Sequence, residues 1–111
     1  MNSHFWYLGS VYSRCPEGIE AAFVTACKVA ARFIKAGIPV FSPIAQSHPV
    51  ALHGGIDPLS HDIWLPADRP MMDAACGIIV VRMEGWEESV GIAHEIAVFK
   101  AAGKPVLYVD P

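Results

Sequence analysis

Charge is scarce in this sequence, and no segment concentrates positive charge. Asp, Glu, Lys and Arg make up 17% of the 111 residues, against roughly 25% in an average soluble protein. The 8 Lys and Arg residues are outnumbered by 11 Asp and Glu, which gives a net charge of −3. Because nucleic-acid phosphates are bound by clusters of basic side chains, we expect no nucleic-acid partner.

Long hydrophobic runs are also missing. The longest uncharged apolar run, from Ala74 to Val81, is far shorter than the roughly 20 residues of a membrane-spanning helix. Met1 to His4 lack the positive charge and the apolar stretch of a signal peptide. Cys15, Cys27 and Cys76 are odd in number and widely spaced, as is typical of reduced thiols. We therefore expect a cytoplasmic protein that does not bind a membrane.

Apolar residues, by contrast, are abundant. They make up 53% of the chain, which is enough to bury a core and excludes a disordered protein. The length is that of one domain, and we expect a single domain over residues 1–111. Because so little of the surface can be charged, we expect a homo-oligomer, with a dimer as the default.

Two amphipathic segments predict long helices. The first lies between Pro16 and Gly37, with carboxylates after the proline and a glycine at its end. The second begins at Ser89, whose hydroxyl can cap it, and ends at Gly103. The side chains expected on their buried faces are Ile19, Phe23, Cys27, Ala30 and Ile34 in the first and Ile92, Ile96 and Phe99 in the second.

The segments between these helices are read from their apolar runs and their prolines. Residues 42–60 contain several prolines and glycines and are predicted to be an irregular, functional loop. Pro66 and Pro70 confine the helix that follows to about residues 69–75. Strands are predicted at residues 5–8, 40–41, 77–81 and 105–109.

The alternation of strands and helices predicts a three-layer α/β fold. Its open, mostly parallel sheet would have four to five strands with helices on both faces, as in Rossmann-like and flavodoxin-like proteins. Residues 77–81 are apolar at every position, which suits a central strand covered on both faces. Ligands of such sheets bind beyond the carboxyl ends of the strands, so candidate functional residues are sought there.

Glu95 is the most informative acidic residue. It borders the expected buried stripe of the last helix, near an N-terminus that favours the charged form of a carboxylate. An ionised carboxylate beside a pocket can attack a sugar carbon. Alternatively, Glu95 is a surface residue that pairs with Lys100 or Arg82.

Asp68 is the second acidic candidate. It precedes Arg69 and Pro70 and could simply cap a helix. In a functional interpretation it is a proton donor or a hydrogen-bond partner for a leaving group. Asp73 lies further into the same predicted helix and is a weaker candidate.

Small and hydroxyl-bearing residues follow the first strand. Gly9, Ser10 and Ser13 would let backbone N–H groups approach a ligand, and the hydroxyls can bind a sugar or a phosphate. An ordinary capped turn explains the same residues. Gly9 has no partner glycines at the spacing of a dinucleotide-binding motif, so we expect no cofactor.

Histidines suggest a metal site only weakly. The spacings of His48, His53, His61 and Asp62 match no compact zinc pattern, and we expect no metal. His48 is expected to shape the loop or to line a pocket. Trp86, in a predicted loop, could stack on a flat ligand or pack at a subunit contact.

Several segments together resemble the nucleoside 2-deoxyribosyltransferases. The opening strand and loop of that family are similar to Tyr7–Ser13, and its nucleophile helix and following strand are similar to Ser89–Glu95 and Gly103–Val106. In the family, a glutamate four residues after a glycine attacks the anomeric carbon. The resemblance implies this role for Glu95.

Related deoxynucleoside 5′-monophosphate N-glycosidases share this plan. Their phosphate-contacting serine matches Ser89, an aspartate near the leaving base matches Asp68, and a tyrosine that sets the nucleophile matches Tyr7. The likeness is greatest to a subgroup of small bacterial and phage proteins that contain segments like 41–44 and 47–49. The residues expected to contact the substrate are Gly9, Ser10, Ser13, Ser42, His48, Trp86, Ser89 and Gly91.

The resemblance implies cleavage or transfer of an N-glycosidic bond in a nucleoside or nucleoside 5′-monophosphate. Ser89, where the transferases have an acidic residue, favours a phosphorylated substrate and hydrolysis. Two other classes of function stay open. One is a nucleotide-binding module without catalysis, and the other is a purely structural component of an oligomer.

Overall fold

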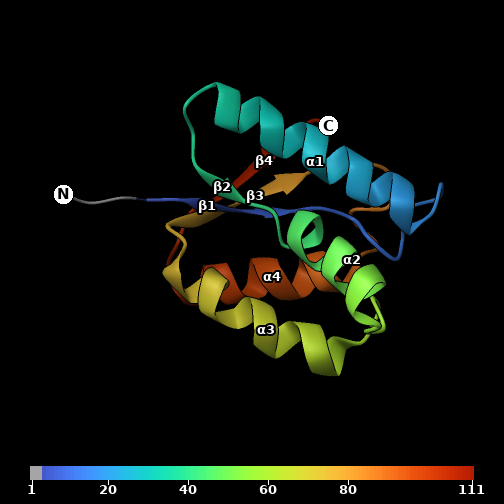
Figure 1. Ribbon diagram of the computed structural model, residues 1–111. Helices are drawn as coiled ribbons and strands as arrows, with labels where there is room; N and C mark the ends of the chain where they lie inside the picture. The colour runs from blue at the N-terminus through green and yellow to red at the C-terminus, as the bar shows by residue number, and fades with distance from the viewer. Residues whose placement is uncertain (1–3) are drawn as a thin grey trace.

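A computed structural model describes residues 4–111 and has the predicted α/β architecture. Within these residues, four parallel strands form one sheet in the order β2-β1-β3-β4, and four helices pack around it (Figure 1). Helix α1 covers one face of the sheet, and α3 and α4 lie on the other (Figure 1). The elements are β1 (Trp6–Gly9), α1 (Ile19–Lys35), β2 (Val40–Phe41), α2 (Pro43–Gly54), α3 (His61–Ala74), β3 (Gly77–Val81), α4 (Val90–Ala101) and β4 (Val106–Val109).

The central strand β3 confirms the interpretation of its apolar run. It pairs with β1 on one side and with β4 on the other, and every one of its residues is buried. Its neighbour β1 contributes Tyr7 and Leu8, both fully buried. Because successive side chains of a strand alternate between faces, Tyr7 points towards α4, where its ring lies 5.6 Å from that of Phe99.

Helix α4 begins and ends close to its predicted limits. The Ser89 hydroxyl accepts a hydrogen bond from the backbone N–H of Ile92 at 3.2 Å and caps the first turn. Ile92 and Phe99 are buried and Ile96 is half-buried, as the predicted stripe requires.

The buried face of α1 differs from the prediction. Of the predicted stripe, Ala30 is buried, but Ile34 is 60% exposed, and the other buried residues are Ala22, Ala26 and Val29. Small side chains let this helix approach the sheet closely, so the alanines face the sheet and the larger Ile34 faces solvent.

Residues 42–60 are not irregular, because most of them form α2. Ser42 accepts a hydrogen bond from the backbone N–H of Ala45 at 3.2 Å, and Pro43 occupies the first turn, where it loses no helical hydrogen bond. Gly55 ends the helix in a left-handed conformation with φ of 69°. The prolines and glycines that predicted a loop are therefore the boundaries of a helix, and only Pro49 lies inside it.

Helix α3 is longer than predicted, since it begins at His61 and contains both Pro66 and Pro70. Proline disfavours the helical conformation of the residue before it, which is why the prediction stopped there. Packing holds the helix in spite of this. Met72 is buried, and the Lys104 ammonium donates to the Asp73 carbonyl at 2.6 Å near the end of the helix.

The cysteines are free, in agreement with the prediction of reduced thiols. Within residues 4–111, no helix combines the length and the apolar character needed to cross a membrane. The prediction about the first residues of the chain falls largely outside the described part.

Candidate functional site

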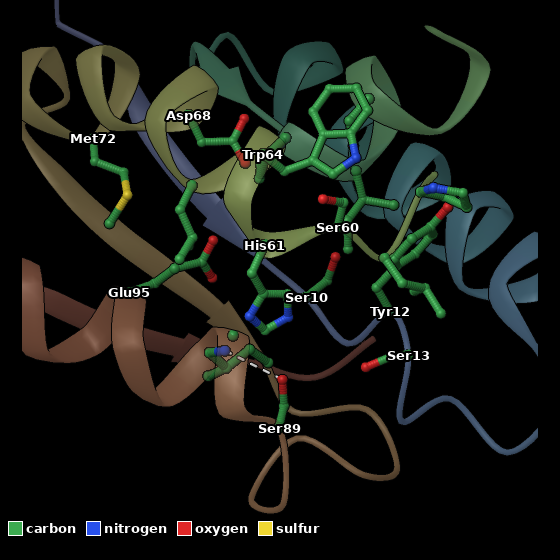
Figure 2. Close-up of a pocket in the computed structure, with 18 of the residues that line it drawn as sticks. Ser10, Tyr12, Ser13, Ser60, His61, Trp64, Asp68, Met72, Ser89 and Glu95 are labelled. Atoms are coloured by element: carbon green, nitrogen blue, oxygen red, sulfur yellow. Dashed lines mark hydrogen bonds between the residues drawn. The ribbon is translucent and has the colours of Figure 1, made fainter. Parts of the chain in front are cut away.

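A cavity opens at the carboxyl ends of β1 and β2, beside the N-terminus of α4 (Figure 2). Its volume is about 130 Å³, and it is partly open to solvent. A cavity of roughly 150 Å³ holds a benzene ring, so this one has room for a single five- or six-membered ring, with the rest of a ligand outside. The residues that line it are Tyr7, Ser10, Tyr12, Ser13, Pro43, Ile44, Ser47, Pro58, Leu59, Ser60, His61, Trp64, Leu65, Asp68, Met72, Ser89, Gly91, Ile92 and Glu95.

Most of the predicted site residues meet in this cavity although they come from separate parts of the chain. They come from β1 and the loop after it, from α3, and from the start of α4. The predicted residues that line the cavity are Tyr7, Ser10, Ser13, Asp68, Ser89, Gly91 and Glu95. The location agrees with the rule that ligands of such sheets bind beyond the carboxyl ends of the strands.

Glu95 lies in the second turn of α4 and reaches the floor of the cavity. The Tyr7 hydroxyl donates a hydrogen bond to Glu95 Oε2 at 2.8 Å. Gly9 lies on the other side of the carboxyl group, because a Cβ atom added at Gly9 would be 3.1 Å from Glu95 Oε1. The alternative in which Glu95 pairs with Arg82 is wrong, since Arg82 pairs with Asp110 at 3.1 Å.

Burial raises the pKa of Glu95 to about 8. The hydrogen bond from Tyr7 lowers this pKa and the nearby charge of Asp68 raises it, but desolvation is the largest effect. At neutral pH a carboxyl group with this pKa is mostly protonated, in contrast to the ionised carboxylate predicted from its place near the helix N-terminus. The effect of a helix N-terminus fades beyond the first turn, and Glu95 lies in the second.

Asp68 occupies the interior of α3, so its interpretation as a helix cap is wrong; Ser60 occupies the cap position. Burial raises the pKa of Asp68 to about 6. Its charge acts on both Glu95 and Tyr7, and the two carboxyl groups form one electrostatic unit. Asp73 points elsewhere and pairs with Arg69 at 2.9 Å on the surface.

Hydroxyl groups form another part of the cavity wall. Ser10 is 7% exposed, and within the described part of the chain its Oγ is a buried polar atom without a hydrogen-bond partner. The Ser89 hydroxyl accepts from Ile92 and keeps its own proton available for a ligand. Because a buried unpaired hydroxyl costs about 1 to 3 kcal/mol, a ligand that pairs with Ser10 would recover that cost.

Other predicted contact residues lie outside the cavity wall. Ser42 caps α2, and Gly9 lies beneath Glu95. Trp86 packs against Tyr108 with their ring centroids 5.6 Å apart. Of the two roles predicted for His48, lining a pocket is wrong, because the side chain is buried outside the cavity wall. It contacts Tyr12, which does line the cavity.

Sequence reasoning missed one wall of the cavity altogether. The first turns of α3 and its cap contribute Ser60, His61, Trp64 and Leu65 to this wall. The predicted loop ended at residue 60, and no helix was predicted between there and about residue 69. Figure 2 shows His61 pointing into the cavity between Ser10 and Ser89 on one side and Glu95 on the other. A serine followed by an acidic residue in the first turn is a helix-start signal that could have revealed this wall.

The buried carboxyl of Glu95 predicts a stability that falls as the pH rises. Below pH 4.5 the group is protonated in both the folded and the unfolded protein. Between pH 4.5 and about 8 only the folded protein keeps the proton, so rising pH favours unfolding. We expect Glu95→Gln, a neutral isostere, to exceed the wild type by up to roughly 4 kcal/mol at pH 8 and to match it closely at pH 5.

Urea unfolding at several pH values measures this difference. Asp68 is present in both proteins, so the difference between them reports the titration of Glu95 together with its interaction with Asp68. A difference between the two proteins that does not change with pH would contradict a buried, protonated carboxyl group.

Within residues 4–111, His, Cys, Asp and Glu side chains form no group of three or more that could hold a metal ion. The groups that line the cavity and can take part in chemistry are two carboxyl groups, two tyrosines, the His61 imidazole and several serine hydroxyls.

Comparison with known proteins identifies a family but no activity. A search of curated proteins finds no match to the chain. Residues 6–110 match the model of a family described as a domain of unknown function, DUF1937. Since the match covers almost the whole chain, the protein belongs to the DUF1937 family.

Proposed function

We propose that the protein cleaves the N-glycosidic bond of a nucleoside or nucleoside 5′-monophosphate, with Glu95 as the nucleophile. The observation that carries the proposal is the carboxyl group of Glu95, held by Tyr7 at 2.8 Å on the floor of a ring-sized cavity that also contains Asp68. The segments Tyr7–Ser13 and Ser89–Glu95, which resemble the nucleoside 2-deoxyribosyltransferases, both contribute to this cavity.

Two carboxyl groups with separate pKa values suit a two-step displacement. Glu95 attacks C1′ of the sugar, and the C1′–N bond breaks with its electron pair going to the base. The pKa values, about 8 for Glu95 and about 6 for Asp68, leave the proton on Glu95 at neutral pH. The proposed step therefore requires that this proton passes from Glu95 to Asp68 when the substrate binds, and Asp68 then gives it to the departing base. Water then attacks C1′ of the glycosyl ester and gives its proton to Asp68, which releases the sugar and regenerates Glu95.

The remaining cavity wall fits the other parts of a nucleotide. Ser10 and Ser89 offer hydroxyl donors beside the N-terminus of α4, where backbone N–H groups favour an anion such as a 5′-phosphate. Trp64 and Leu65 offer an aromatic and an apolar surface against which a flat base can pack. The cavity volume of about 130 Å³ admits the sugar ring, while the base and phosphate extend to its rim.

A second candidate is a nucleotide-binding module without catalysis. The pKa of Glu95, about 8, favours this alternative, because a protonated carboxyl is a poor nucleophile. Catalysis requires that a bound substrate, with positive charge developing at C1′, lower this pKa and expel the proton.

A panel of deoxynucleosides and their 5′-monophosphates, assayed by chromatography for free base, tests the proposal. We expect release of base from at least one member, and faster release from monophosphates than from nucleosides. Adding a second base as acceptor distinguishes hydrolysis from transfer. Binding without any product would favour the module, and no thermal shift with any member would favour a structural role.

We also propose that the protein is a homo-oligomer, which light scattering tests.

A further inference from the structure

Three side chains from different elements form a continuous hydrogen-bonded chain beside the cavity. The Tyr12 hydroxyl lies 2.6 Å from His48 Nδ1, and His48 Nε2 lies 2.7 Å from Glu20 Oε2. Tyr12 belongs to the loop after β1, His48 to α2 and Glu20 to α1. The chain runs from a surface carboxylate, through an imidazole that is 2% exposed, to a tyrosine that lines the cavity.

The His48 ring is fixed from two sides. Phe23 stacks on it with ring centroids 4.5 Å apart and an angle of 23° between the planes. Tyr12 meets it edge-on, at 5.7 Å and 84°. A ring enclosed in this way cannot turn to find other partners, so both of its nitrogen atoms stay committed to Tyr12 and Glu20.

The carboxylate of Glu20 sets the donor and the acceptor in both hydrogen bonds of His48. An ionised Glu20 only accepts, so His48 Nε2 carries a proton and donates it. In a neutral imidazole the other nitrogen is then an acceptor, and the Tyr12 hydroxyl donates to it. Burial, together with the charge of Glu20, raises the pKa of Tyr12, which keeps this hydroxyl protonated. Because the Tyr12 proton is used in the hydrogen bond to His48, the Tyr12 oxygen can only accept a hydrogen bond from a ligand.

We propose that Tyr12 is a ligand-contacting residue of the cavity, which accepts a hydrogen bond from a sugar hydroxyl or an exocyclic amino group, and that His48 and Glu20 are its positioning residues. This inference rests on the proposed function for the kind of ligand, a nucleoside 5′-monophosphate. It adds a specificity contact that the two carboxyl groups do not provide. It also gives His48 a role at the site although the residue lies behind the cavity wall.

A double-mutant cycle tests the proposal. The substitutions are Tyr12→Phe, which removes the hydroxyl, and His48→Phe, which keeps a ring against Phe23 but removes both hydrogen bonds. Affinities for dAMP, dGMP, dCMP and dTMP are measured by titration calorimetry in a Glu95→Gln background, which prevents turnover. For the nucleotide that binds most tightly, we expect each substitution to weaken binding about 5- to 10-fold, and the pair to weaken it no more than one alone.

Variants of the outer residue separate positioning from packing. Glu20→Gln keeps an acceptor for His48 Nε2 and should bind like the parent, whereas Glu20→Ala should bind about 3-fold more weakly. His53→Phe, at an exposed position of the same helix, is the matched control and should change nothing. Thermal unfolding of each variant checks that the fold is retained.

The possible results lead to separate conclusions. Additive losses from Tyr12→Phe and His48→Phe, or parental affinity in Tyr12→Phe, would overturn the role of this chain and leave the glycosidase proposal intact. Coupled losses, together with a wild-type protein that releases no base from any of these nucleotides, would support the chain and overturn the chemistry. No binding of any of the four nucleotides would overturn both.

Discussion

Replacing Glu95 with Ala is expected to reduce release of free base by at least about 1,000-fold while the fold is retained. The substitution removes the carboxyl group that Tyr7 holds at 2.8 Å, so the glycosyl ester of the proposed mechanism cannot form. Glu95→Gln should lose as much activity, because an amide can still accept the hydrogen bond from Tyr7 but cannot attack C1′. Chromatography of the reaction with the best substrate measures the loss.

Two features make this test specific. Glu88→Gln, on the exposed loop just before α4, is the matched control and should keep full activity. Circular dichroism and thermal unfolding verify that the Glu95 variants are folded. Unchanged turnover in a folded Glu95→Ala protein would remove Glu95 from the mechanism.

Substitution of Gly77 by Ala is expected to give the largest loss of stability, about 3 kcal/mol. A Cβ atom at this position would lie 2.5 Å from Trp6 Cζ3 and 2.8 Å from the carbonyl oxygen of Pro105. That carbonyl accepts a hydrogen bond from the backbone N–H of Ile78 at 3.0 Å, so it cannot move without disturbing the ladder between β3 and β4. The central strand would have to shift as a whole.

Gly54→Ala supplies the comparison for Gly77. A Cβ atom added at Gly54 would meet nothing within 4 Å, and alanine favours the helix that ends there. This variant should be equal in stability to the wild type or slightly more stable. Urea unfolding measures both, and a Gly77→Ala protein as stable as Gly54→Ala would mean that β3 and β4 do not pack as closely as described.

The layered fold could be predicted because its sheet and its two outer helices have strong local signals. Residues 77–81 are apolar throughout, and the Ser89 cap and Gly103 limit the last helix. The helices in the middle of the chain were not predicted in full, because each proline there was interpreted as a residue that interrupts a helix. Pro43 begins a helix because proline suits the first turn. Pro49 is tolerated inside the helix, which packs against α1.

The residues of the candidate site also divide into those that the sequence could predict and those that it could not. Glu95 and Ser10 were identified because they lie next to well-predicted strand and helix ends. Trp64 and His61 were not, because they belong to α3, whose extent depends on tertiary contacts. The protonation state of Glu95 also could not be predicted from the sequence, because desolvation depends on neighbours from other elements. Position in a helix alone favours the opposite state.

The prolines of α3 have a consequence for how a ligand enters. Pro66 and Pro70 lack the N–H groups that would bond one turn back, so α3 has fewer backbone hydrogen bonds than a proline-free helix of its length. Elements of this kind open locally at a lower free energy than the protein as a whole. The wall of the cavity that α3 forms can therefore open more easily than the other walls. We expect the amide hydrogens of α3 to exchange faster than those of β3, and to exchange more slowly when a ligand fills the cavity.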